Sequence, residues 1–276
     1  MNTRWLVSPT AAASPGWWRF FLAGAVLCLA APLLQQASGA AGGDYAWTVG
    51  YGIAATALHV VALAYAARRR MPRRGPGALH HWVQAHIYGG TLFLVLLVVH
   101  SGGVLPQGML AWGLWLSSLW VVGTGLLGVF IQKWIPPALT SALATEVHYD
   151  RIPELVAAVR EKVELLVSAS GESVRRFHAT NLEAALSGPR TSVAYFFDIT
   201  GGIQSRMRGF DHLKRLLDAS DVQRLEELRI LMRTKLEMDV HYTLQKALRW
   251  WLYLHVPAAL LLTLLVAFHV FAVLYY

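Results

Sequence analysis

Four histidines with a repeated spacing are the residues of this chain best suited to chemistry. His86 and His100 lie fourteen positions apart in one apolar stretch, and His255 and His269 lie fourteen apart in another. In a helix, fourteen residues give about 21 Å of rise and only about 40° of rotation. Each helix would therefore carry two imidazoles on nearly one face. Two such helices side by side predict two bis-histidine cages, and paired imidazoles are axial ligands of haem iron.

The residues around these histidines resemble the two haem-binding helices of the cytochrome b superfamily. The matching runs are His86-Ile-Tyr-Gly-Gly followed by His100, and His255-Val-Pro followed by His269. In that family too, thirteen residues separate the two histidines of each helix. The resemblance implies a four-helix core, two haems b and electron transfer. The family's proline-glutamate-tryptophan quinone motif is absent, so the resemblance implies a divergent member and no particular substrate.

The composition is that of a membrane protein. Hydrophobic residues make up 55% of the 276 and charged residues only 14%, whereas about a quarter of a soluble domain is charged. The single cysteine, Cys28, excludes a disulfide within the chain and an iron–sulfur cluster held by it. We expect an all-α integral membrane bundle of about five transmembrane helices with a cytoplasmic helical insertion. The apolar segments are Trp17–Leu34, Tyr45–Ala66, Trp82–Val104, Leu110–Trp134 and Trp250–Tyr276.

These segments predict four regions along the chain. Residues 1–44 hold an N-terminal membrane helix or uncleaved signal anchor, and residues 45–134 hold the second to fourth transmembrane helices. Residues 135–248 form a polar, mainly helical insertion, and residues 249–276 form the final haem-binding helix. The first segment also has the features of a cleavable signal peptide, because small residues follow it at Ser38–Ala40. Its retention as a helix is the favoured alternative.

Basic residues predict the orientation of the spans. The stretch Arg68–Arg74 holds five arginines, whereas the loops Gln35–Ala46 and Ser101–Met109 hold no lysine or arginine. By the positive-inside rule, the N-terminus, the arginine stretch and the insertion are cytoplasmic, and the chain is a multi-pass protein of the inner (plasma) membrane. The third and fifth spans then run in parallel. This direction pairs His86 with His255 and His100 with His269.

The insertion has its own helical patterns. Apolar residues recur at helical spacing over Pro153–Ser168, which predicts an amphipathic helix. The pair Ser220-Asp221 is predicted to be the N-cap of a charged helix that reaches about Lys246 and can run without a break into the final span. The stretch Ser192–Ile199 is predicted to be one short strand, and Gly201-Gly202 a turn.

Several further residues are candidates for binding the cofactor. Arg249 precedes the last span and is a candidate partner for a haem propionate, because a guanidinium binds carboxylates with two parallel hydrogen bonds. Arg73 and Arg74 lie near the start of the third span and could act in the same way. Gly89 and Gly90 would let a macrocycle or a neighbouring helix come close, and ordinary helix packing is the alternative.

A quinone site is a further hypothesis. His59 lies in the second span, and we expect it to cluster with His86 and Tyr88 near the cytoplasmic side. A histidine there could both bind a quinone by hydrogen bonding and move its protons. The alternative is that His59 only ties two helices together.

The sequence predicts an electron carrier with no hydride chemistry of its own. It contains no dinucleotide fingerprint, no P-loop and no HExxH motif. We attribute the net charge of +8 to basic residues that set the membrane topology, not to nucleic-acid binding. We expect a b-type cytochrome with two bis-histidine haems that works as an electron-transfer subunit between the quinone pool and a redox partner such as a cytochrome c or an iron–sulfur or flavoprotein subunit. The alternatives are the membrane subunit of a ferric-reductase-like or flavoprotein-linked reductase, and a non-redox scaffold or sensor.

Overall fold

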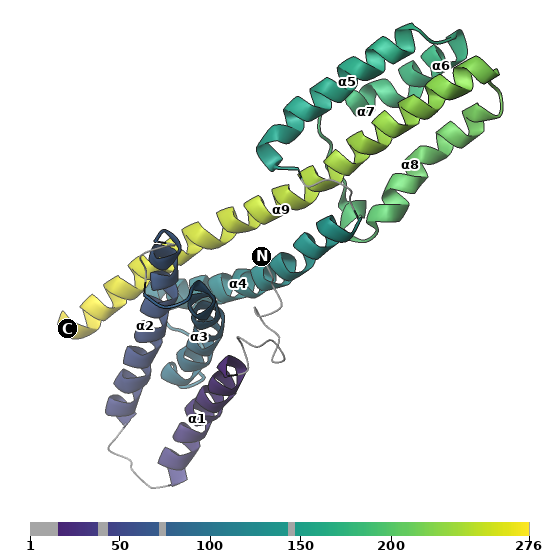
Figure 1. Ribbon diagram of the computed structural model, residues 1–276. Coiled ribbons are helices and arrows are strands. Elements are labelled where there is room, and N and C mark those ends of the chain that lie inside the picture. The colour runs from purple at the N-terminus through teal and green to yellow at the C-terminus, as the bar shows by residue number, and fades with distance from the viewer. Residues whose placement is uncertain (1–15, 38–43, 72–75, 143–146, 276) are drawn as a thin grey trace. The chain divides into compact units, whose positions relative to one another are not determined.

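The structure is a computed structural model that describes residues 16–37, 44–71, 76–142 and 147–275 (Figure 1). Of these described residues 87% are helical, and none is in a strand. The all-α fold class predicted from the sequence is confirmed. Arg73, Arg74 and the Ser38–Ala40 stretch lie outside the described residues.

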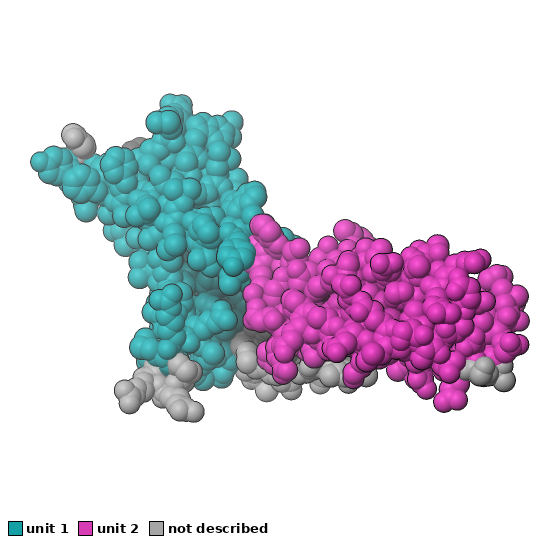
Figure 2. All heavy atoms as spheres, turned by 90° about the horizontal axis from the view of Figure 1, so that it is seen from above, with its two compact units in different colours: residues 1–133, 251–276 teal, residues 134–250 magenta. Residues whose placement is uncertain are grey.

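The chain divides into two compact units, which Figure 2 colours separately. Unit 1 comprises residues 1–133 and 251–276, and unit 2 comprises residues 134–250. The predicted insertion, residues 135–248, falls within unit 2. Two long helices, α4 (Met109–Ala142) and α9 (Ala219–Tyr275), have residues in both units.

Unit 1 is built from apolar helices: α1 (Trp17–Ala37), α2 (Asp44–Arg69), α3 (Leu79–His100), most of α4 and the end of α9. In the described part, α2, α3, α4 and α9 are long and apolar enough to cross a membrane, so the chain is a helical membrane protein. The apolar part of α1 is described over Trp17–Ala31. Four of the five expected spans are therefore long and apolar enough to cross a membrane among the described residues.

Close packing of α3 against α1 and α2 aligns the helices of unit 1. A Cβ at Gly24 of α1 would lie 3.0 Å from Leu92 of α3, so these helices approach closely there. The ring of Phe21 lies 6.0 Å from that of Tyr88. A buried cluster then joins residues of α2, α3, α4 and α9: Ala55, Phe93, Leu96, Val122 and Leu262.

The turn between α2 and α3 is held by one arginine. Arg68 is buried, and its guanidinium donates to the carbonyl oxygens of Pro76, Met71 and Gly77 at 2.7–3.1 Å. Gly77 has a φ of +66°, a conformation that glycine adopts without steric cost. The Trp82 indole also donates to the Pro76 oxygen. These contacts set the position at which α3 begins relative to α2, and hence the position of His86.

Unit 2 is a helical layer packed on the polar part of α9. Its helices are α5 (Ile152–Ser168), α6 (Glu172–Phe177), α7 (Glu183–Leu186) and α8 (Ile199–Lys214), with a π-helical segment η3 (His178–Leu182) and two 3₁₀ turns, η2 (Tyr149–Arg151) and η4 (Val193–Phe196). Apolar faces of these helices enclose one core that includes Ile152, Val163, Leu228 and Leu236. The amphipathic helix predicted over Pro153–Ser168 is confirmed, and α9 runs unbroken from Ala219 to Tyr275.

Three predictions in the insertion are wrong. The pair Ser220-Asp221 is not an N-cap, because α9 already begins at Ala219. The stretch Ser192–Ile199 is not a strand: η4 occupies Val193–Phe196 and α8 begins at Ile199. Gly201 is not in a turn, because the Asp198 carboxylate caps α8 by accepting the Gly201 N–H at 2.7 Å. A Cβ at position 201 would lie 2.1 Å from that carboxylate, so glycine serves the cap.

A buried ion pair on α9 holds the segment that leads into η4. The Lys235 ammonium lies 2.7 Å from Asp239, and both side chains are fully buried. The other carboxylate oxygen of Asp239 accepts the Arg190 N–H at 2.8 Å. Such a pair is retained only when its groups are well bonded, because each isolated charge is costly to bury. The pair thereby fixes the backbone at Arg190.

Candidate functional site

The four histidines of the repeated spacing meet in two pairs in unit 1. The ring centres of His86 and His255 lie 6.2 Å apart with ring planes at 81°. Those of His100 and His269 also lie 6.2 Å apart, with planes at 84°. Each pair joins α3 to α9, and these are the pairs that a parallel direction of the two helices predicts.

Hydrogen bonds fix which nitrogen of each ring carries the proton. His86 Nδ1 lies 2.9 Å from the Ala62 carbonyl oxygen, and His100 Nδ1 lies 2.8 Å from that of Thr48. A carbonyl can only accept, so Nδ1 is the protonated nitrogen in both rings. In the neutral ring, Nε2 then keeps its lone pair. Both acceptors belong to α2, which therefore orients the histidines of α3.

A threonine of α4 does the same for His255. The Thr124 hydroxyl donates its one hydrogen to a backbone carbonyl, that of Trp120 at 2.7 Å. It therefore accepts from His255 Nδ1, which lies 3.0 Å away. The indole of Trp251 donates to the Thr124 carbonyl at 2.7 Å and stacks on the His255 ring. The lone pair of His255 is thus also left on Nε2.

Glycines make room for these rings on α2 and α4. A Cβ at Gly52 would lie 2.9 Å from Cε1 of His100, and one at Gly125 would lie 3.4 Å from Cε1 of His255. At Gly128 a Cβ would overlap the Trp251 ring at 2.1 Å. The aromatic ring of Tyr65 covers His86 at 5.1 Å.

The predicted glycines Gly89 and Gly90 lie elsewhere. A Cβ at Gly89 would make an ordinary 3.8 Å contact with Leu58, and one at Gly90 would meet nothing within 4 Å. Gly89 thus contributes to packing of α3 on α2. The roles of both in binding a cofactor stay predictions.

The predicted cluster of His59, His86 and Tyr88 does not form. Tyr88 faces Phe21 of α1, whereas His86 faces α2 and α9. His59 is buried, and its Nε2 lies 3.1 Å from the Thr263 hydroxyl. Thr263 is eight residues after His255 and six before His269, so His59 lies at a depth between the two pairs.

Arg249 is engaged within unit 2. Its guanidinium donates to both carboxylate oxygens of Asp150, at 2.7 and 2.9 Å, and lies over the Tyr149 ring. Both bonds come from one nitrogen, Nη2, so the guanidinium that the sequence suggested for a propionate binds a carboxylate of the chain itself, without two parallel hydrogen bonds. His241, also in unit 2, is buried beside Gln245.

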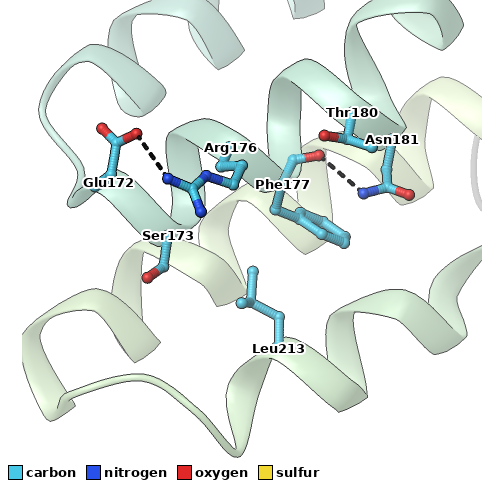
Figure 3. A pocket seen from close by; sticks show the side chains of 7 residues that line it. All are labelled: Glu172, Ser173, Arg176, Phe177, Thr180, Asn181 and Leu213. Atoms are coloured by element: carbon cyan, nitrogen blue, oxygen red, sulfur yellow. Dashed lines mark hydrogen bonds and ion pairs between the residues drawn. The ribbon is translucent and has the colours of Figure 1, made fainter.

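The side chains of α6 and η3 line an open cavity of about 380 Å³ in unit 2 (Figure 3). Within it Glu172 pairs with Arg176, and the Asn181 amide donates to the Phe177 carbonyl. The lining residues are Glu172, Ser173, Arg176, Phe177, Thr180, Asn181 and Leu213. This arrangement offers no evident nucleophile or metal-ligand set.

The number of possible ligand side chains distinguishes between a bare metal ion and a haem. The described residues contain no group of three or more histidine, cysteine, aspartate or glutamate side chains placed to hold a metal ion. Protein zinc sites use three or four such ligands. A haem brings four nitrogens of its own and needs only two axial side chains, so each histidine pair fits a haem better than a bare ion.

Fold and site together define a helical membrane protein with two histidine pairs between the same two helices, at two depths. No family model, curated protein or solved structure matches the chain. The function is therefore argued from these pairs.

Proposed function

We propose that the protein is a membrane b-type cytochrome that binds two haems, one between His86 and His255 and one between His100 and His269. The observation that supports this most is the separation of the rings. Metal–imidazole bonds are about 2.0 Å long, so two imidazoles on opposite sides of one iron have ring centres about 6.2–6.4 Å apart. Both pairs lie at 6.2 Å.

A direct hydrogen bond between the rings fits less well. It would bring the two nitrogens to about 3 Å and the ring centres to about 5.2 Å. In the first pair, moreover, both Nε2 atoms keep lone pairs, because both Nδ1 atoms donate elsewhere. Two neighbouring rings that both keep a lone pair can bind one electron-pair acceptor, and polar residues within a membrane usually have a function.

The chain's own contribution is to hold and orient the ligands. The Ala62, Thr48 and Thr124 oxygens set the tautomers, and a hydrogen bond from Nδ1 to such an oxygen raises the basicity of the other ring nitrogen. Bound haem would supply one-electron exchange at each pair. Because the pairs are fourteen residues apart on both helices, about 21 Å of rise separates the two redox sites. The role that follows is electron transfer between the two faces of the membrane.

Purified protein is expected to contain two non-covalent haems b per chain, both low-spin. When the two imidazole planes are perpendicular, the iron d orbitals that interact with them stay close in energy. Ferric haem with such ligands then has an unusually large maximum g value. The ring planes at 81° and 84° therefore predict two such signals in electron paramagnetic resonance. Pyridine-haem quantitation checks the stoichiometry. Protein without a Soret band after haem-replete expression would instead support a scaffold or sensor.

The electron source is the second part of the proposal. The sequence holds no dinucleotide motif, so a quinol or a partner protein must supply or take the electrons. We expect quinol analogues to reduce the haems of the purified protein within seconds. A soluble flavoprotein with NAD(P)H that reduces them while quinol does not would favour the flavoprotein-linked reductase.

The proposed orientation places unit 2 in the cytoplasm. It is supported by Arg68, Arg69 and Arg70 at the end of α2, while the α3–α4 connection carries no lysine or arginine. In a Cys28→Ser background, a cysteine at Gln107 should react with an impermeant reagent added outside intact cells. A cysteine at Ser187 should react only after the membrane is opened, and the reverse pattern would invert the topology.

A further inference from the structure

One surface of unit 2 combines high apolar exposure with a position next to the membrane boundary. In η4 and the residue after it, Val193 is 73% exposed and Phe197 is 86% exposed. Exposed side chains of this size cost free energy in water and, when clustered, mark a surface that meets another apolar phase. The surface formed by Val193 and Phe197 is called the η4 tip below.

Two helices of unit 2 mark where the membrane ends. In α4 the pair Lys133-Trp134 carries the first charged residue of the helix, and in α9 the pair Arg249-Trp250 directly precedes an uncharged run to Tyr275. Tryptophan at the headgroup level beside a basic residue is typical of the boundary on the positive side of a membrane. The same two-residue pattern on both helices therefore indicates one boundary.

The η4 tip is tied to both of these helices. The Phe196 ring stacks on Trp134, with ring centres 6.2 Å apart and planes at 17°. The Ser192 N–H donates to the Thr243 hydroxyl, seven residues or about 10 Å of helix before Trp250. In a 3₁₀ turn, side chains three apart share one side. Val193 therefore lies on the side that Phe196 turns toward Trp134.

The backbone under the tip is rigidly held. Tyr195 is buried with only 1% of its surface exposed, and the Arg206 guanidinium lies over its ring. Asp239 and Thr243 of α9 bind the backbone N–H groups of Arg190 and Ser192. A fixed backbone with outward apolar side chains loses little conformational entropy when it enters a lipid surface.

We propose that the η4 tip is a membrane-inserting element, in which Val193 and Phe197 enter the headgroup layer of the bilayer that α4 and α9 cross. The occupant is lipid because the stacked Trp134 makes the tip continuous with the lipid boundary of α4. Interfacial segments bury apolar side chains about 5–10 Å into this layer. Lys133 beside Trp134 adds attraction for anionic headgroups. The proposal holds whether or not haem is bound.

Spin labelling of the full chain in nanodiscs with anionic lipid tests it. In a Cys28→Ser background, nitroxides are attached at Phe197→Cys and, separately, at Val193→Cys. Both positions are exposed, so neither change removes a core contact. The matched control is Leu216→Cys, 72% exposed in the same unit but just before α9 begins, about 46 Å of helix from Trp250. Power-saturation measurements compare collisions with oxygen, which partitions into lipid, and with a water-soluble nickel chelate.

The expected result is a several-fold higher oxygen-to-nickel collision ratio at positions 193 and 197 than at 216. A ratio at 197 equal to that at 216 would overturn the proposal, since the tip would then face water. Protection of 197 from both reagents would also overturn it, because a second copy of the chain would then cover the tip. Unchanged helicity by circular dichroism shows that each labelled variant is folded.

Discussion

Alanine at His86 or at His255 is expected to remove the same haem, and alanine at His100 or His269 the other. The reason is the pairing across α3 and α9, with ring centres 6.2 Å apart in each pair. Loss of one histidine of a pair would leave a haem held by a single imidazole, so its binding is expected to weaken. Each single variant should retain about one low-spin haem per chain, where two are expected in the parent. Pyridine-haem quantitation and low-temperature spectra of the α bands measure this.

His59→Gln is the matched control for these variants. His59 is a buried histidine of the same unit, yet it bonds Thr263 and belongs to neither pair. The control should retain both haems. If His86 and His269 variants lost the same haem instead, the parallel arrangement of α3 and α9 would be wrong. Loss of both haems from every variant would show only that the bundle needs each histidine to fold.

The pairing of the histidines was predictable because it depends on few quantities. Fourteen residues return a helix to nearly the same face, so each helix had to present two rings on one side. The arginine stretch Arg68–Arg74 then set the direction of the third span and, through the number of crossings, that of the fifth. No detail of side-chain packing enters this argument.

The environment of the pairs was less predictable. The rings lie against Thr124, Gly52 and Gly125. Threonine and glycine are common in membrane helices, and their spacing in the sequence does not show which of them lies beside a histidine. Which of them meets a histidine depends on the rotation of α2 and α4. Placing Tyr88 beside His86 was avoidable, since residues two apart on a helix point about 160° away from each other. The depth of His59 depends on the shift of α2 along α9.

The error over residues 192–199 has a different cause. Val193, Tyr195 and Phe197 recur at every second position, as on one face of a strand. In the structure only Tyr195 is buried, while Val193 and Phe197 are exposed. A strand also needs a neighbour for its backbone groups, and the described residues offer none. Side chains of α9 bind those groups instead, through Asp239 and Thr243. The local sequence pattern could not predict these hydrogen-bond partners, because they lie about 50 residues away in the chain.

Gly52→Ala is expected to disturb only the His100–His269 pair. The added Cβ would lie 2.9 Å from Cε1 and 3.1 Å from Nδ1 of His100, and the ring cannot move away without breaking its 2.8 Å bond to the Thr48 carbonyl. Removing the hydrogen-bond partner of a metal-binding histidine typically weakens metal binding about 10–100-fold. We expect partial loss of this haem in Gly52→Ala and full loss in Gly52→Val, with the haem at His86 and His255 unchanged.

The matched control is Gly50→Ala, two residues earlier in α2, where a Cβ would meet nothing within 4 Å. Both substitutions raise the helix propensity of α2 by the same amount, about 1 kcal/mol. A change in the stability of α2 therefore cannot explain a loss of haem that is seen only in Gly52→Ala. Haem titrations of the two purified variants, followed by the Soret band, give the affinity of each site. Equal affinities at both sites in the two variants would mean that His100 does not hold the haem from the position described, and the second haem site would have to be sought elsewhere.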